Sequence, residues 1–422
     1  MKLRIALISD HASPLAALGG ADCGGQNVYV SEIARALASY GHAVDVFTRR
    51  DDPALPMVVA ARDGVRVIHV PAGPATAVRK EELLPFMTEF SAFTTGWCAC
   101  EDGGYDIVHA NFWMSGLVAL ELQERLGIPF VVTFHALGRV RRLHHGAADG
   151  FPEARIEIEE RIIDGASRVI AECPQDEQDL LTLYDADAER ISTIPCGVDT
   201  MTFRPVPRRR ARSIVGLERS ERVVLQLGRL VPRKGIDNVI RGIARLRDLH
   251  GVEATLVIVG GESDDPDPLR TPEIGRLTGI AESEGVAELV RFVGRRGRDT
   301  LRYYYSAADV FVTTPWYEPF GLTPLESMAC GTPVIGADVG GIRYTISDGE
   351  TGHLVPPNDP EALADRLARV LTEPRHRQAL AEHGLRRANE HFSWPCVARA
   401  VEELYEDVLA ADEAAADLSL TA

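Results

Sequence analysis

The sequence has few features of a membrane protein or of a general nucleic-acid binder. Its 45 lysines and arginines are outnumbered by 62 aspartates and glutamates, which gives a net charge of −17. This acidity argues against general binding to polyanions. The start, MKLRIALISD, has one short apolar run that predicts a strand, and no window approaches the roughly 20 apolar residues of a membrane span. We therefore expect no nucleic-acid partner and no stable membrane insertion.

Cysteine is scarce and irregularly spaced. The seven cysteines are an odd number and fit no metal framework, since the Cys98-Ala-Cys100 pair is far in sequence from the other cysteines. His144 and His145 are adjacent, so they do not form a pair on one helix face. These observations predict a reduced, cytoplasmic protein with no metal site.

A dinucleotide-binding fingerprint is also missing. The segment GGADCGGQ (19–26) follows the first predicted strand, yet it does not spell G-x-G-x-x-G, and no acid closes the strand at 43–48. Nicotinamide and flavin cofactors are therefore not expected. Gly24 and Gly25, at the start of a predicted helix, could still let another phosphate approach the backbone. An ordinary flexible loop is the other interpretation of this segment.

Strand-like and helix-like runs alternate along the first half of the chain. A helix is predicted over 27–40, with Gly41 as its stop. Such alternation is typical of a parallel sheet with helices on both faces. The predicted strands cover residues 3–9, 43–48, 65–70, 106–110, 129–135 and 168–172.

Proline, glycine and charge accumulate over 194–212, after which the alternation restarts. The basic run RRRAR (208–212) is interpreted as a solvated linker. The second series of predicted strands covers residues 222–230, 254–261, 289–294, 309–314 and 332–336. The fold class is therefore α/β, with two doubly wound Rossmann-like domains facing each other across a cleft. Their expected limits are 1–205 and 206–394, followed by a helix at 395–410 that packs back on the first domain and a mobile tail at 411–422.

Two glutamates lie in the segment EPFGLTPLESMACGTPVIG (318–336). Pro315 and Pro319 place Glu318 in a loop after a strand, where a ligand role is the favoured interpretation. Thr323 is predicted to cap a short helix whose N-terminus would favour an anion. Glu326 has two interpretations that stay open: a capping-box acid, or a ligand-binding carboxylate.

Two further loops carry candidate residues. Arg229 and Lys234 follow a predicted strand in LGRLVPRKG (227–235) and could clamp a diphosphate, although exposed basic loop residues are common. His135 ends the strand at 129–135, at the edge where the first domain would face the cleft. A lone histidine is more often structural than catalytic.

Taken together, the four segments resemble family 4 of the retaining, nucleotide-sugar-dependent glycosyltransferases with the GT-B fold. EPFGLTPLESMACGTPVIG, GRLVPRKG, GGADCGGQNVYV and HALGRVRR carry the resemblance, which covers about residues 1–410. Within that family the chain looks most similar to sucrose-phosphate synthases and to the inositol-phosphate N-acetylglucosaminyltransferase of mycothiol synthesis. GGQNVYV, NFWMSG (111–116) and IPCGVDTMTFRP (194–205) carry this closer likeness.

The resemblance implies a role for each matching residue. Arg229 and Lys234 would hold the donor diphosphate, and Glu326 the ribose hydroxyls. Glu318 would face the hydroxyls of the transferred sugar, and His135 would orient that sugar. These two residues, with Arg229 and Lys234, form the expected catalytic set. The remaining donor-binding residues would be Gly24, Gly25, Val293, Arg296, Phe320, Gly321, Leu322 and Thr323.

The resemblance also implies a reaction. A hexosyl group would move with retention from a nucleoside diphosphate sugar, with UDP as first choice and ADP or GDP as alternatives, to a small hydroxyl acceptor such as a sugar or cyclitol phosphate. The resemblance implies that no cofactor or metal is required, and it allows the protein to form a homo-oligomer. The expected acceptor-binding residues are Lys80, Asn111, Arg139 and Arg155, although surface charge is an equal explanation for Lys80 and Arg155.

Two departures from the family pattern bear on the acceptor. Phe112 stands where the mycothiol enzyme has tyrosine, and Ala136 replaces a hydroxyl residue after the histidine. Both remove polar contacts, which argues against inositol phosphate. Other open alternatives are a disaccharide phosphorylase on the same fold, a transferase acting on a lipid or polysaccharide, and a non-catalytic nucleotide-sugar sensor.

Overall fold

The computed structural model describes residues 2–15, 24–60, 64–146 and 149–421, so the predicted phosphate loop at 19–26 is described only from Gly24 onward. The described chain forms two compact units, one containing the residues up to 195 and from 397 onward, the other residues 196–396. The boundary predicted at 205 thus lies inside the second unit. The reason is packing: Val198 N donates to Phe392 O over 2.7 Å, and the Phe203 ring lies 6.1 Å from that of Tyr305.

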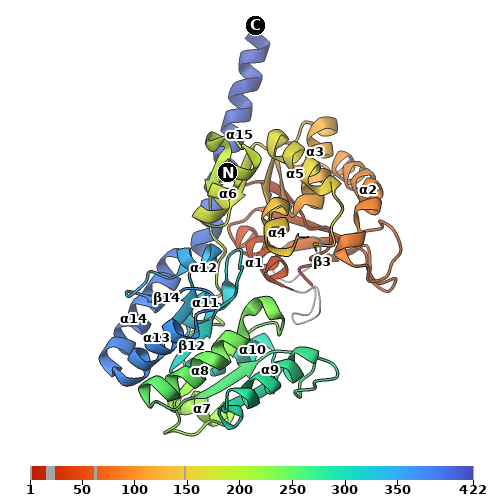
Figure 1. The fold of residues 1–422 in the computed structure, drawn as a ribbon. Coiled ribbons are helices and arrows are strands. Elements are labelled where there is room, and N and C mark those ends of the chain that lie inside the picture. Colours follow the sequence, from red (N-terminus) through yellow and green to blue (C-terminus); the bar gives the residue numbers. More distant parts are fainter. Residues whose placement is uncertain (1, 16–23, 61–63, 147–148, 422) are drawn as a thin grey trace. The chain divides into compact units, whose positions relative to one another are not determined.

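The first unit is built on an eight-stranded sheet of order β3-β4-β2-β1-β5-β6-β7-β8, in which only the edge pair β3–β4 is antiparallel (Figure 1). Its strands are β1 (Arg4–Ile8), β2 (Ala43–Arg49), β3 (Val58–Ala60), β4 (Val65–Val70), β5 (Ile107–Asn111), β6 (Phe130–Thr133), β7 (Arg168–Ala171) and β8 (Ile191–Thr193). Its helices are α1 (Gly25–Ser39), α2 (Met87–Cys100), α3 (Trp113–Leu126), α4 (Gly138–His145), α5 (Ala154–Gly165) and α6 (Pro174–Tyr184), with short 3-10 turns at Lys80–Glu82, Leu84–Phe86 and Ala188–Arg190. β5 and β6 are buried throughout, as expected for apolar strands covered on both faces.

The C-terminal helix α15 (Trp394–Thr421) completes the first unit after the chain has passed through the second. Its Tyr405 Oη lies 2.7 Å from Nδ1 of His109 on β5, and Glu402 lies 2.9 Å from Nε2 of His42. Burial lowers the pKa of His109 to about 3, assisted by His135, so the ring is neutral. The tail from 411, expected to be mobile, continues α15, because its alanine-rich sequence favours a helix.

The second unit has a six-stranded, fully parallel sheet of order β11-β10-β9-β12-β13-β14 (Figure 1). Its strands are β9 (Val223–Leu227), β10 (Thr255–Val259), β11 (Val290–Gly294), β12 (Val310–Thr313), β13 (Val334–Ala337) and β14 (Gly352–Val355). Its helices are α7 (Arg208–Val215), α8 (Ile236–His250), α9 (Pro272–Ser283), α10 (Arg298–Ala307), α11 (Leu322–Ala329), α12 (Gly340–Thr345), α13 (Pro360–Thr372) and α14 (Pro374–His391), with 3-10 turns at Pro232–Lys234 and Ala287–Leu289.

Alternation along β12 shows how helices cover both faces of this sheet. Val310 and Val312 point into the core that α8, α9 and α13 supply. Phe311 between them points the other way, with its ring 5.4 Å from Tyr305 of α10.

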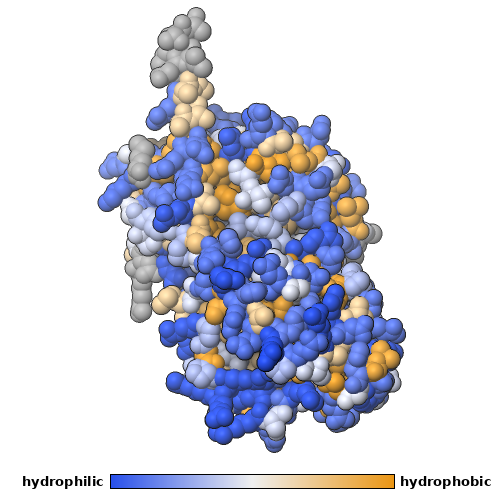
Figure 2. Space-filling view, turned by 90° about the vertical axis from the view of Figure 1, so that its left-hand side faces the viewer, coloured by the Kyte–Doolittle hydropathy of each residue, from blue (hydrophilic) through white to orange (hydrophobic). Residues whose placement is uncertain are grey.

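Hydrophilic side chains cover most of the face drawn in Figure 2, and hydrophobic ones gather there in small groups.

The basic run RRRAR was predicted to be a solvated linker, and this is wrong for its last residue. The run forms the start of α7, where Arg212 is only 2% exposed and pairs with the buried carboxylate of Asp309. Arg208 and Arg377 pair with the same carboxylate. Arg208, Arg212 and Arg377 therefore take part in the packing of the second unit, through ion pairs that join α7 and α14 to Asp309.

Candidate functional site

Two loops of the second unit, after β9 and after β12, are joined by hydrogen bonds. Trp316 N donates to Arg233 O over 3.1 Å, and Thr314 Oγ1 donates to Gly235 O over 3.0 Å. The Arg233 guanidinium also donates to Tyr317 O over 3.1 Å. Because β9 and β12 are parallel neighbours, both loops leave the same edge of the sheet. The predicted cationic loop and the predicted acidic loop therefore form one structure.

Lys234 and Glu318 form an ion pair at this junction, and each side chain is only 15% exposed. Arg233 lies 3.6 Å from the same carboxylate. Burial opposes ionisation of Glu318, but the positive charges of Lys234, Arg233 and Arg229 outweigh it and lower its pKa. Burial also lowers the pKa of Lys234, with help from Arg233 and Arg229, despite the attraction of Glu318. Three cations thus surround one carboxylate, a local excess of positive charge that suits an anionic ligand.

The acidic loop ends at the N-terminus of α11. Thr323 was predicted to cap this helix, but α11 begins at Leu322, and its N-cap is Gly321 in the left-handed region, with φ of 92°. Glycine takes this conformation readily, whereas threonine does not, which explains the shift. The first amide groups of α11 have no intrahelical acceptor, and the helix dipole favours negative charge there. An anion can therefore be bound beside the cation cluster.

The glycines before α12 fix the acidic loop from the other side. Gly341 N donates to the carbonyls of Glu318 and Pro319, over 3.2 and 3.1 Å. Gly340 has a φ of +43°, and a Cβ there would lie 2.1 Å from Glu318 O. Only glycine allows this approach, so the Gly340–Gly341 pair holds Glu318 in place. This pair was not predicted from the sequence.

Glu326 lies on α11 and accepts a hydrogen bond from Tyr305 Oη over 2.9 Å. Because the helix starts at Leu322, with Gly321 as cap, Glu326 is not the third residue after the cap, and the capping-box interpretation is wrong. Burial raises the pKa of Glu326 to about 7, although Arg298 and Tyr305 oppose the shift. Burial makes the charged form of Glu326 unfavourable, so the carboxylate does not serve stability. Binding of a ligand would explain its presence.

Replacing Glu326 with glutamine is expected to stabilise the unliganded protein at high pH. The folded pKa of about 7 lies above the ordinary 4.5, so the folded state loses stability as pH rises from 4.5 through 7. Glu326→Gln keeps an acceptor for Tyr305 and removes the charge, so it should gain up to about 3 kcal/mol at pH 8 and nothing near pH 4.5. Thermal unfolding at the two pH values measures this difference. Glu350→Gln, an exposed change in the same unit, is the control; equal gains at both pH values for Glu326→Gln would contradict the assignment.

The base-binding candidates lie further along the same sheet edge. Val293 is near the end of β11, and Arg296 follows it, donating to Asp264 O over 2.6 Å and to Tyr304 Oη over 3.2 Å. All strands of this sheet are parallel, so β9, β11 and β12 present their C-terminal ends on one side. The structure therefore brings the donor-binding candidates of the second unit to one edge.

In the first unit, His135 lies just after β6 with its backbone in the left-handed region, at φ of 58°. Its ring is held on both sides: Nδ1 lies 3.1 Å from Glu172 Oε1, and Nε2 lies 3.1 Å from Asn111 Oδ1. The Tyr29 ring meets it edge-on at 4.8 Å between centroids. His135 is therefore a fixed group at the C-terminal edge of the sheet.

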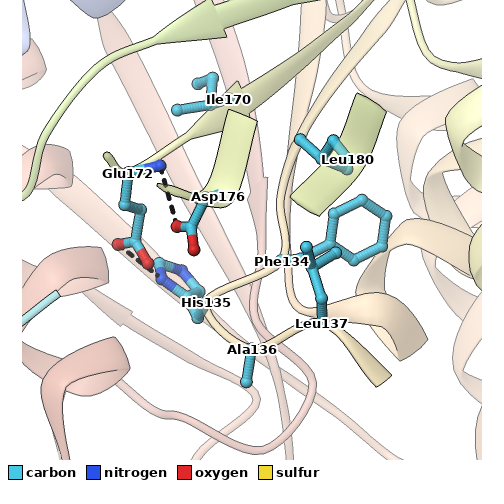
Figure 3. A pocket seen from close by; sticks show the side chains of 8 residues that line it. All are labelled: Phe134, His135, Ala136, Leu137, Ile170, Glu172, Asp176 and Leu180. Atoms are coloured by element: carbon cyan, nitrogen blue, oxygen red, sulfur yellow. Dashed lines mark hydrogen bonds and ion pairs between the residues drawn. The ribbon is translucent and has the colours of Figure 1, made fainter. Parts of the chain in front are cut away.

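A small pocket adjoins this histidine (Figure 3). Glu172 and Asp176 point toward the His135 ring, while Leu180 lies on the apolar side of the pocket. Burial, and the nearby charge of Glu172, raise the pKa of Asp176 well above its ordinary value. The residues that line the pocket are Phe134, His135, Ala136, Leu137, Ile170, Glu172, Asp176 and Leu180.

The start of α1 is tied to the same edge. Gly24 N donates to Asn27 Oδ1 over 3.0 Å, which fixes the first turn of the helix. Gln26 Nε2 donates to Asn111 O over 3.1 Å, at the end of β5. The start of α1, with Gly24 and Gly25, therefore lies beside Asn111 at the end of β5.

The basic residues predicted to bind the acceptor differ in burial and in their ion-pair partners. Lys80 is half-buried in a 3-10 turn, and Arg139 pairs with Glu160 on α5. Arg155 is only 1% exposed: its Nε donates to the buried carboxylate of Glu159 over 2.7 Å, and its guanidinium lies over the Phe151 ring. The Arg155 guanidinium thus forms a buried ion pair inside the protein, and it is not a surface charge.

A second carboxylate–histidine pair was missed by the sequence analysis. Asp10 is fully buried at the end of β1, accepts from Ser115 Oγ over 2.6 Å, and lies 2.9 Å from Nδ1 of His11. The His11 ring meets the Phe112 ring edge-on at 4.8 Å. The signal was present as the dipeptide Asp-His after the first strand, but only the structure shows the contacts that hold it.

Comparison with known proteins gives two family matches that together cover most of the chain. Residues 207–387 match the model described as glycosyl transferases group 1, and residues 24–197 match the model described as glycosyl transferase 4-like domain.

Within the described residues, no helix is both long and apolar enough to cross a membrane.

Individual relatives agree with these matches. A protein named D-inositol 3-phosphate glycosyltransferase 2, from Catenulispora acidiphila, is 38% identical over 95% of this chain and 94% of its own. A D-inositol 3-phosphate glycosyltransferase from Actinosynnema mirum is 40% identical over 93% of this chain and 94% of its own. The solved structure of a sucrose-phosphate synthase from Thermosynechococcus elongatus is 36% identical, with a TM-score of 0.86, over 97% of this chain and 100% of that one.

Proposed function

This chain belongs to the group 1 glycosyltransferases and has their two-domain GT-B fold, and on that premise we propose that it moves a hexosyl group from a nucleoside diphosphate sugar to a small hydroxyl acceptor, with retention of configuration. The observation that carries the proposal is the cluster of Arg229, Arg233 and Lys234 around Glu318, beside the N-terminus of α11.

The donor is proposed to bind at this cluster. Its diphosphate would accept hydrogen bonds from Arg229 and Lys234 and from the first amides of α11, including those of Leu322 and Thr323. Glu318 would then be free to accept from hydroxyls of the sugar, once the diphosphate shares Lys234. Glu326 would accept from the ribose hydroxyls in its ionised form, since a carboxylate can accept from two neighbouring hydroxyls.

The other donor-binding residues complete the proposal. In the second unit these are Val293 and Arg296 toward the base, and the backbone of Phe320 and Gly321. The first unit would contribute Gly24 and Gly25 to donor binding and His135 to catalysis. UDP is the proposed nucleotide, with ADP and GDP as alternatives.

The chemistry follows from charge. The bond between the anomeric carbon and the phosphate oxygen breaks, and a bond to the acceptor oxygen forms on the same face, through an oxocarbenium-like state. The departing phosphate takes the acceptor's proton. Negative charge grows on that phosphate in the transition state, so the fixed cations Arg229, Arg233 and Lys234 supply the stabilisation. The proposal requires no metal ion for this reason.

The acceptor is proposed to be a sugar or a cyclitol, in free or phosphorylated form. The names of the relatives support a phosphorylated acceptor. Lys80, Asn111 and Arg139 are the proposed acceptor residues. Arg155 was expected among them, but the buried pair that it forms with Glu159 supports an indirect role.

A thermal-shift panel of UDP-, ADP- and GDP-sugars, followed by product analysis with hexose phosphates, inositol phosphates and free polyols, tests the function. We expect one donor to raise the melting temperature and to yield a product of the donor's anomeric configuration. Product formed from a sugar 1-phosphate without nucleotide would instead identify a phosphorylase. Failure of every donor to bind would contradict the proposal. A reducing, cytoplasmic location is also proposed, because the cysteines are few and irregularly spaced.

A further inference from the structure

His135 adopts a backbone conformation that is unfavourable for its residue type. Its φ of 58° lies in the left-handed region, which glycine enters easily and other residues enter at a cost of about 1 kcal/mol or more. Such a conformation persists only where the surroundings hold it. The contacts of the ring therefore decide where this residue points.

The ring is held by two acceptors from neighbouring strands. Glu172 follows β7 and lies at Nδ1, and Asn111 ends β5 and lies at Nε2. Asn111 Nδ2 donates to His109 O over 3.3 Å, so its oxygen faces the histidine. The side chains of His135 and Glu172 are only 9% and 4% exposed, so water competes little for this contact. Both nitrogens of His135 thus face oxygen acceptors.

We propose that Glu172 is a positioning residue for His135 in the transfer reaction. Its carboxylate accepts Nδ1–H and thereby fixes the rotation of the ring. Glu172 is itself fixed, because its backbone N donates to Asp176 Oδ2 over 3.2 Å at the start of α6 (Figure 3). The inference rests on the proposed function for its kinetic test only.

The backbone of the same loop has a separate support. Glu159 accepts from Gly138 N over 2.9 Å, and Arg155 donates to Ala136 O. Tyr184 Oη accepts from Arg139 N over 2.9 Å and itself donates to Glu159. Because this support does not involve Glu172, removing Glu172 should release the ring while the loop keeps its course.

The kinetic test compares Glu172→Ala, Glu172→Gln and wild type. Displacement of a catalytic group by about 1 Å can cost about a hundredfold, so we expect kcat of Glu172→Ala to fall by roughly that factor while the donor KM changes by less than about threefold. Glu172→Gln, which keeps an oxygen acceptor, should recover at least about tenfold of the loss. Glu177→Gln is the matched control, a carboxylate on α6 whose partner is Thr193, and should retain wild-type kcat. Normal kcat in a folded Glu172→Ala variant would overturn the proposal.

A spectroscopic test needs no substrate, so it separates this inference from the proposed function. In protein labelled with ¹⁵N-histidine, a slowly exchanging ring N–H signal should be present in wild type and absent from His135→Asn, whose asparagine tolerates the left-handed backbone. The signal should shift in Glu172→Gln and vanish in Glu172→Ala. If Glu172→Ala fails to fold, the glutamine variant decides: an unchanged signal overturns the contact with Glu172. Lack of turnover by wild type, with the signal as expected, would reject the proposed function alone.

Discussion

Replacing Lys234 with alanine is expected to lower kcat/KM by about a hundredfold to a thousandfold, because the departing diphosphate loses a fixed cation at the point where its charge grows. The fold should survive. Burial already lowers the pKa of Lys234, so its charge is held at a cost in the unliganded protein. Its removal leaves the buried Glu318 carboxylate with Arg233 and Arg229 alone, so we expect a loss of about 3 kcal/mol or less in the free energy of unfolding. Steady-state kinetics with the donor found in the panel, together with thermal unfolding, measures both quantities.

The control for this prediction is Arg241→Ala, which removes a half-exposed cation of α8 paired with Asp237. It should leave kcat/KM unchanged. A double variant, Lys234→Ala with Glu318→Gln, removes both members of the ion pair, and it should be as inactive as the single variant while unfolding at a temperature closer to wild type. Near-normal turnover by Lys234→Ala would contradict the role of the cation cluster.

Replacing Gly340 with alanine is expected to damage both stability and activity. Its Cβ would lie 2.1 Å from Glu318 O, and its φ of +43° is itself unfavourable for alanine. The carbonyl cannot move without moving the acidic loop, so we expect a loss of about 2–4 kcal/mol in the free energy of unfolding. Because Glu318 and the start of α11 shift together, kcat/KM should fall by about a hundredfold. Thermal unfolding and donor kinetics on the purified variant check both expectations.

Gly349→Ala separates backbone strain from displacement of the loop. Gly349 also has a positive φ, of +76°, but no atom lies within 4 Å of the position that its Cβ would take. It should lose only about 1 kcal/mol and keep its activity. If Gly340→Ala lost no more stability and activity than Gly349→Ala, the contact between α12 and Glu318 would not be needed for activity.

The sequence predicts the two sheets well where strands are apolar and β-branched. Residues 309–314 and 254–261 were predicted as strands and contain β12 and β10. β14, with the sequence GHLV, has a glycine and a histidine, and β3 and β8 are three residues each, so their local patterns are too weak to identify. These strands exist because a neighbouring strand offers hydrogen bonds, and one stretch of sequence cannot show that neighbour.

In the candidate site, too, the local sequence predicts which residues follow a strand but not which of them come into contact. Sequence reasoning placed Lys234 and Glu318 after strands, but only the sheet order shows that β9 and β12 are neighbours and that the two side chains meet. It could not find Glu172 or the Gly340–Gly341 pair, since their importance depends on contacts across strands and loops. Arg155 and Glu159 stand four apart, which suggests a helical ion pair, but their burial under aromatic rings is a tertiary property.

The return of α15 to the first unit has a consequence for synthesis of the protein on the ribosome. Tyr405 and Glu402 supply partners for His109 and His42, which are buried in a unit whose other residues end at 195. At about 5–20 residues per second, roughly 200 intervening residues delay that helix by about 10–40 s. During this interval the nascent first unit lacks one of its covering helices. A polypeptide truncated before residue 397 would remain in that incomplete state, and is a poor substitute for the chain that contains α15.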